Sequence, residues 1–440
     1  METKVTIFFN GLVARLRTSL FVLPMFCIAG AVGLGEAITA FDRSLGQGIS
    51  DLPLGFTSTV ESARAVVSTI AGATITVAGI AFSISILMFQ LASSQYSPRV
   101  IHGLFRDPFN KRVMGLVAGT FTYCLIVLRS IRSAIDDNGE AVIPNVSVAV
   151  ALVLGIAALL AIVAFINHTA HAMDISRILS RVTKDTLERI ETNWLPKDEP
   201  EVEASSIAPE AKGFVIRSLN GGWVDLVDED ALLRSLPAGG CMRMDVVPGV
   251  YVVAGQTMAE VWPALSGEMG STCEKRVRRA VHIAVARSSD QDPLYGLRQV
   301  VDVALKALSP GINDPTTAQD AMFHSATLVA EFGQRRPRAM SRSGEEGRRL
   351  LVQRRPGHEA VFALAYDELR LTAASNPHAA AYLIESVRLV AGSGVGPDLG
   401  SRLRVHADLI LGAAERAGAT GRDLARLRDV HAGVSAALAG

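Results

Sequence analysis

The stretch VSVAVALVLGIAALLAIVAFINHTAHA, residues 146–172, decides the fold of this chain, because it is long and apolar enough to cross a bilayer as one helix. A membrane-spanning helix needs about 20 consecutive apolar residues. Three other stretches meet the same condition, at roughly 19–40, 66–92 and 113–132. The sequence therefore predicts a transmembrane domain of four helices over residues 1–172, with the lipid bilayer as its surroundings.

The composition agrees with a chain that is partly in the membrane and partly in water. Of its 440 residues, 49% are hydrophobic and 20% are charged, and the apolar runs end near residue 172. The formal net charge is zero, which argues against nucleic-acid binding as the main task. The four cysteines lack the spacing of zinc or redox motifs, so we predict no metal and no cofactor.

Lysine and arginine are distributed unevenly between the short loops. The segment before the first span, the loop between the second and third, and the segment after the fourth are all basic. The loop at 133–145 has no lysine or arginine and carries Asp136, Asp137 and Glu140. Basic loops stay in the cytoplasm, so both termini are expected there.

Residues 173–440 read as a cytoplasmic α+β domain in three parts. Residues 173–211 form a helical stalk and an acidic linker; the helix either pairs with neighbouring chains or lies on its own domain. Residues 212–290 contain short β-type runs broken by glycine turns, and resemble the small β-sandwich of biotinyl and lipoyl carriers without their lysine.

Residues 291–440 are predicted to form a helical bundle. Candidate helices lie at 358–374, 377–392 and 398–437, the last broken at Gly418 to Gly421. A basic segment at 334–357 is expected to be a solvated loop in contact with anionic lipid.

Three segments together resemble one known family. They are QLASSQYSPRV (90–100), FINHTAHA (165–172) and YGLRQVVDVALKALSPGINDPTTA (295–318). They are similar to the bacterial membrane proteins grouped as domain-of-unknown-function family 2254. The resemblance covers nearly the whole chain. It implies a multi-pass protein of the bacterial inner membrane with a cytoplasmic domain, and it implies no activity.

The corner SPGINDP joins two helical stretches and carries three interpretations. Pro310 cannot continue a helix, Gly311 tolerates the left-handed conformation that ends one, and Asp314 before Pro315 caps the next. The structural interpretation is a helix–turn–helix corner formed by Ser309, Pro310, Gly311, Asn313, Asp314 and Pro315. The alternatives are an anion site using Thr316 and Thr317, or a cation site using Asp314, Asp320 and His324.

A stripe of mostly small and polar residues runs down the second span at helical spacing. Its members are Gly72, Thr76, Gly79, Ser83, Ile86 and Gln90. Such a stripe either lines a pore or lets helices pack closely. A polar cluster follows it, and we predict a cytoplasmic entrance formed by Gln95, Tyr96, Arg99, His168 and His171. The two histidines either anchor the span at the interface or sense protons.

Five arginines in the water-exposed part form either an anion or lipid-headgroup site or ordinary surface ion pairs. They are Arg276, Arg278, Arg279, Arg287 and Arg298. No catalytic motif is found, so no catalytic residue is predicted. The leading hypothesis is a homo-oligomeric channel with the second span lining the path. The alternatives are a scaffold or ligand sensor acting through the cytoplasmic domain, and a membrane enzyme using the SPGINDP corner.

Overall fold

The computed structural model describes residues 22–45, 59–95, 108–131, 144–172, 174–198, 209–352 and 355–439. The chain divides into two compact units, one made of the long apolar helices up to Asp174 and one formed mainly by residues from Ile175 onward. Each unit has its own hydrophobic core.

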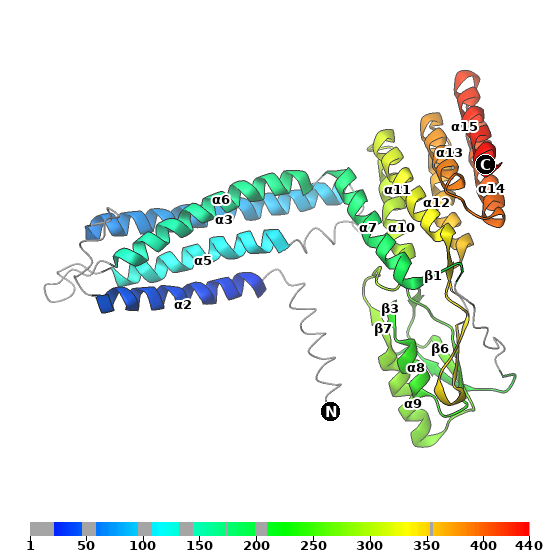
Figure 1. Ribbon diagram of the computed structural model, residues 1–440, viewed down its shortest axis with the longest axis horizontal. Coiled ribbons are helices and arrows are strands. Elements are labelled where there is room, and N and C mark those ends of the chain that lie inside the picture. Colours follow the sequence, from blue (N-terminus) through cyan, green and yellow to red (C-terminus); the bar gives the residue numbers. More distant parts are fainter. Residues whose placement is uncertain are drawn as a thin grey trace. The chain divides into compact units, whose positions relative to one another are not determined.

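In the described part of the first unit, four helices are long and apolar enough to cross a membrane, as predicted. They lie side by side in Figure 1 as α2 (Val22–Leu45), α3 (Val60–Gln95), α5 (Pro108–Ser130) and α6 (Asn145–Ala172). Helices α2 and α5 approach closely because Gly115 faces Cys27. A Cβ atom at Gly115 would lie 2.7 Å from the Cys27 sulfur, so a larger residue does not fit there.

The membrane unit is also joined by polar contacts at one end of its helices. The Asp42 carboxylate near the end of α2 accepts hydrogen bonds from the backbone N–H groups of Val146 and Ser147, at 3.1 and 2.9 Å. These N–H groups have no partner within the first turn of α6, so a carboxylate there satisfies them and complements the helix dipole. The Tyr123 hydroxyl of α5 donates to the Ser147 carbonyl, which ties a third helix to the same point.

The second unit begins with α7 (Ile175–Asn193) and continues into a β-rich part. Its elements are β1 (Trp194–Pro196), β2 (Phe214–Arg217), β3 (Gly222–Val227), α8 (Glu229–Ser235), β4 (Cys241–Met244), β5 (Tyr251–Val252), β6 (Thr257–Trp262), α9 (Gly267–Ala280) and β7 (Val281–Ala284). One sheet has the strand order β2-β6-β4-β10-β9 and another has the order β5-β3-β7.

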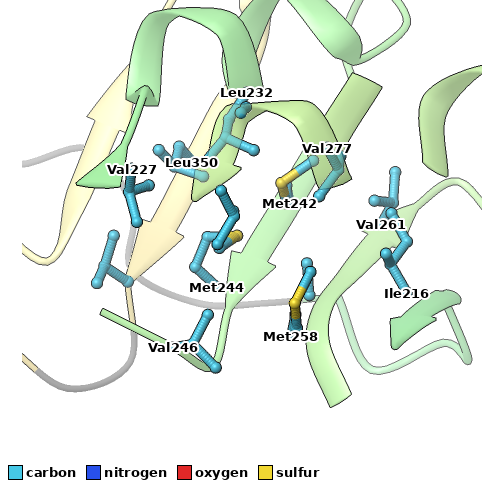
Figure 2. Close-up of a cluster of buried hydrophobic side chains, with 14 of the residues drawn as sticks. Ile216, Val227, Leu232, Met242, Met244, Val246, Met258, Val261, Val277 and Leu350 are labelled. Atoms are coloured by element: carbon cyan, nitrogen blue, oxygen red, sulfur yellow. The ribbon is translucent and has the colours of Figure 1, made fainter. Parts of the chain in front are cut away.

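Both sheets bury side chains in one core, shown in Figure 2. Strand β4 illustrates the alternation of a strand: Met242 and Met244 point into this core, and Cys241 packs on the other side with Trp262. Helices α8 and α9 add Leu232 and Val277 to the same core. The small sandwich expected from the sequence is thus a pair of sheets that share their core with two helices.

The basic segment 334–357 differs from the expected solvated loop. It forms β8 (Arg335–Pro337), β9 (Ser341–Ser343), a 3-10 turn (Glu345–Gly347) and β10 (Arg349–Val352). Strand β10 pairs in parallel with β4, so this segment completes the larger sheet. Its arginines meet acidic side chains: Arg342 bonds Asp230 at 2.6 Å, and Arg355 bonds Glu229. Those partners lie on α8, more than a hundred residues earlier in the chain. The composition of the segment alone therefore could not reveal them.

The remaining helices form a stack of three helical hairpins instead of a bundle around one axis. They are α10 (Pro293–Ala307), α11 (Pro315–Gln334), α12 (His358–Ala373), α13 (Pro377–Ala391), α14 (Pro397–Arg416) and α15 (Gly421–Ala439). Helices α11, α13 and α15 make one layer, and α10, α12 and α14 make the other (Figure 1). The predicted break near Gly418 is confirmed, because α14 ends at Arg416 and α15 begins at Gly421.

Helix α7 lies on the first hairpin of this stack, which decides between the two interpretations of the stalk in favour of packing on its own domain. Its buried residues Ile178, Leu179 and Ile190 face α10 and α11. The closest approach is at Gly296 of α10, where a Cβ atom would lie 2.0 Å from the Thr186 hydroxyl oxygen. Only glycine therefore fits at this contact.

We predict that Gly296→Ala separates α7 from α10 and destabilises the second unit by about 1–3 kcal/mol, the usual cost of overpacking. Thermal unfolding of the purified full-length protein measures the change. Gly311→Ala is the matched control, because a Cβ atom at Gly311 meets nothing within 4 Å. Equal stability of Gly296→Ala and the native protein would show that the α7 contact is not close.

Candidate functional site

The predicted stripe on α3 lies on the side of the helix that its own chain leaves uncovered. The opposite side of α3 packs in the membrane unit through Ala63, Val67, Ala71 and Ala81. All six stripe residues are exposed. With 3.6 residues per turn, residues 72, 76, 79 and 83 fall opposite residues 67, 74 and 81. Close packing against another described helix of the same chain therefore does not explain the stripe.

The two glycines of the stripe make the same point. A Cβ atom at Gly72 or Gly79 would meet no atom within 4 Å, although Gly155 of α6 does face Ile70 of α3 at close range. The hydroxyl groups of Thr76 and Ser83 donate to the carbonyls of Gly72 and Gly79, at 2.8 and 2.9 Å. Each hydroxyl oxygen thus keeps its lone pairs for a group outside the helix.

The predicted entrance is only partly described. Tyr96 and Arg99, together with the side chain of Gln95, lie outside the described residues. His168 is half-buried and its ring lies 4.6 Å from that of Phe109 on α5, whereas His171 is exposed. His168 thus packs against α5, whereas His171 is exposed, so the two histidines lie in different environments.

The SPGINDP corner has the geometry of a helix–turn–helix junction. Asp314 accepts hydrogen bonds from the N–H groups of Thr316 and Thr317, both at 3.1 Å, and from the Thr317 hydroxyl at 2.6 Å. These bonds to the charged form, with that of Thr317 the strongest, hold the pKa of Asp314 below its ordinary value. The cap thus occupies the N–H groups and the threonine hydroxyl that an anion would need.

One detail of the corner differs from the expectation. The residue in the left-handed conformation is Asn313, with φ of 50°, and not Gly311. Asparagine tolerates this conformation better than most side chains because it is short and polar. The backbone N–H of Asp314 then reaches the Ala307 carbonyl at 2.8 Å and closes the turn.

The residues of the cation interpretation connect helices instead of meeting around an ion. Asp320 accepts a hydrogen bond from the Ser176 hydroxyl at 2.8 Å, and His324 Nδ1 lies 2.9 Å from the Thr183 hydroxyl oxygen. Both partners belong to α7. Within the ranges that the structure describes, no three histidine, cysteine or acidic side chains are grouped closely enough to hold a metal.

The structure separates the five arginines of the predicted anion site. Arg298 bonds Asp302 and Glu368, and Arg287 bonds Asp292 at 2.6 Å beneath the rings of Trp223 and Tyr295. Arg276, Arg278 and Arg279 lie together on α9. The arginines therefore do not form one site. Arg287 and Arg298 bond acidic side chains of α10 and α12 or next to them, and the other three lie on α9, where Arg278 pairs with Glu274.

The described helices and strands first show the class of protein to which the chain belongs. Four apolar helices of spanning length, followed by a folded α/β unit, are those of a polytopic membrane protein. The chain belongs to the DUF2254 family of predicted membrane proteins, whose family model matches residues 17–388. The match confirms the resemblance that rests on three segments of the sequence, one of which contains SPGINDP.

Similar proteins occur in mycobacteria. Uncharacterized proteins of Mycobacterium tuberculosis, from strains H37Rv and CDC 1551, and of Mycobacterium bovis are each 29% identical over 405 residues. The alignment covers 91% of this chain and 77% of each relative. No solved structure matches the chain.

Removal of the Asp314 cap tests the structural role of the corner. We expect Asp314→Ala to lower the free energy of unfolding by about 0.5–2 kcal/mol, and Asp314→Asn to leave it nearly unchanged because asparagine caps equally well. Thermal unfolding of the full-length protein in detergent gives both values. A fold indifferent to Asp314→Ala would contradict the cap.

The cap also predicts a pH dependence. Because the folded pKa of Asp314 lies below the ordinary value of 3.8, its contribution is present above that pH and is lost as the pH falls through the folded pKa. The stability difference between the native protein and Asp314→Asn should therefore change only at acidic pH. A difference that changes between neutral and mildly acidic pH would have another origin.

Proposed function

We propose that the protein is a homo-oligomeric channel of the bacterial inner membrane, in which α3 of each chain lines a shared path. The observation that carries the proposal is the position of the stripe. It lies opposite the face by which α3 packs in its own chain, and its glycines contact no neighbouring atom. In lipid, small residues on an outer face gain nothing from the acyl chains, but they let a second helix approach.

The chemistry of the stripe indicates what such a path accepts. The charged residues of α3, Glu61 and Arg64, lie in its first turns, and no charge follows along the rest of the helix. The outward groups of Thr76 and Ser83 are oxygen lone pairs, since their hydrogens are given to carbonyls of the helix. Oxygen acceptors replace water around a cation, so a path of this kind favours small cations.

The second unit serves as a cytoplasmic vestibule or gate in this proposal. The basic short loops favour a cytoplasmic position for both termini, which supports this assignment. Helix α7 begins three residues after α6 ends and is held on the hairpin stack by Thr186 and Thr183. In this proposal, movement of the stack is transmitted to α7 and, through the chain, to the C-terminal end of α6.

A ligand sensor or scaffold is the second candidate function, and the same coupling favours it. A stack of helical hairpins presents extended surfaces to partners, as repeat-like helical proteins do. In that case the membrane helices anchor the unit and conduct nothing.

Substitution in the stripe tests the proposal. Gly79→Leu places a large side chain where neighbouring α3 helices meet, and should lower ion flux or oligomer formation about tenfold, since a clash of about 1.4 kcal/mol suffices for that factor. Gly33→Leu is the matched control, because Gly33 of α2 is also a helix glycine with no atom near its Cβ position. Flux of K⁺ into proteoliposomes and the mass of the protein in nanodiscs are the measurements.

The two readouts separate the candidate functions. A native protein that forms oligomers but leaves liposomes as tight as empty ones contradicts the channel and leaves the sensor. A native protein that stays monomeric in nanodiscs contradicts both the channel and the shared path. Equal effects of Gly33→Leu and Gly79→Leu would show that the stripe has no special role.

A further inference from the structure

A hollow of about 300 Å³ opens on the β-rich part of the second unit. It lies between the β2–β3 turn, the last turn of α9 and the beginning of β7. Its apolar side is formed by Met258, Val281 and Ile283, and its basic side by Arg278, Arg279 and His282. Met258 is part of the main core, as Figure 2 shows, so the apolar side rests on a well-packed layer.

Of the two arginines that line this hollow, Arg279 is the one whose guanidinium is available to a ligand. Arg278 bonds Glu274 at 2.6 Å and donates to the Arg217 carbonyl at 3.1 Å, so internal partners occupy it. Arg279 is exposed and has no hydrogen bond or ion pair within the described part of the chain. A guanidinium at the rim of a partly apolar hollow is suited to bind an oxyanion through two parallel hydrogen bonds.

His282 is the second polar group of the rim, and Asp225 fixes its orientation. The Nδ1 atom of His282 lies 3.1 Å from the Asp225 carboxylate, which also accepts a hydrogen bond from the Ser288 hydroxyl. An ionised carboxylate only accepts, so Nδ1 carries a hydrogen and Nε2 is left for a ligand. Protonation of the ring makes Nε2 a hydrogen-bond donor to an anion.

The remaining charges nearby leave the rim positive. The positive charges are those of Arg217, Arg278 and Arg279, and the negative charges are those of Glu274 and Asp225. Glu274 pairs with Arg278, and Asp225 bonds the Ser288 hydroxyl and the His282 ring. The β2–β3 turn contributes Ser218 and Asn220 to the lining, and Leu219 extends the apolar side.

We propose that this hollow binds a phosphate monoester with a small apolar body. The phosphate meets Arg279 and His282 Nε2, and the apolar body lies on Met258, Ile283 and Leu219. A phosphate monoester offers three acceptor oxygens and up to two charges, which match a guanidinium fork and an oriented imidazole. A free phosphate ester and the headgroup of phosphatidic acid share this chemistry. The inference is independent of the proposed channel.

Phenyl phosphate is the probe, titrated calorimetrically into the full-length protein in phosphatidylcholine nanodiscs. Arg279→Gln and His282→Gln should each weaken binding about tenfold or more, the usual effect of losing a charge-assisted hydrogen bond. Arg276→Gln is the matched control, because Arg276 is exposed on the same helix and does not line the hollow. Inorganic phosphate should bind more weakly than phenyl phosphate, since it leaves the apolar side uncovered.

Three results would overturn the proposal. They are the absence of phenyl phosphate binding to the native protein, equal loss in Arg276→Gln, and unchanged affinity in Arg279→Gln, which would leave Arg279 only the role of a basic residue at the end of α9. Nanodiscs that contain phosphatidic acid distinguish the two sources. Loss of phenyl phosphate binding in them identifies the lipid headgroup as the ligand, and retained binding identifies a free phosphate ester.

Discussion

The close contact between α7 and α10 is the constraint on which the second unit depends. Gly296 leaves room for Thr186, and this lets the buried face of α7 reach the first helical hairpin. A stack of hairpins needs a cover at each end, because its terminal units would otherwise expose apolar surface. Helix α7 provides that cover at one end, and the largely exposed α15 ends the stack at the other. The same helix follows α6 in the chain, so the helix that covers the hairpin stack also connects it to the membrane unit.

The membrane unit depends on a different balance. Lipid is as apolar as leucine, so the helices of the membrane unit gain little from burying apolar side chains against one another. Close contact at Gly115 and a shared polar network around Asp42 hold α2, α5 and α6 together. Helix α3 uses one face for this packing and leaves its small and polar face outside.

Much of the candidate sites could be predicted from local sequence, and the limits have physical causes. The Asp314 cap follows from an aspartate placed before a proline, a pattern whose energetics involve only the next turn. The five arginines could be singled out by their type alone. Two of the partners that divide them, Asp292 and Asp302, lie within five residues of Arg287 and Arg298, but Glu368 comes from α12 and gave no local signal. His282 gave no signal in the sequence, since its orientation comes from Asp225 on a neighbouring strand.

Hydropathy and helical periodicity act over one element at a time, so local sequence was enough to predict the four spanning helices and most helices after residue 290, and three short segments were enough to indicate the family. Long-range packing decided that residues 349–352 pair with β4, that the hairpins stack in two layers, and that α7 lies on its own domain. Those outcomes depend on contacts between residues far apart in the chain. Which face of α3 is free was likewise decided by packing, because periodicity places the stripe on one side without saying what lies against it.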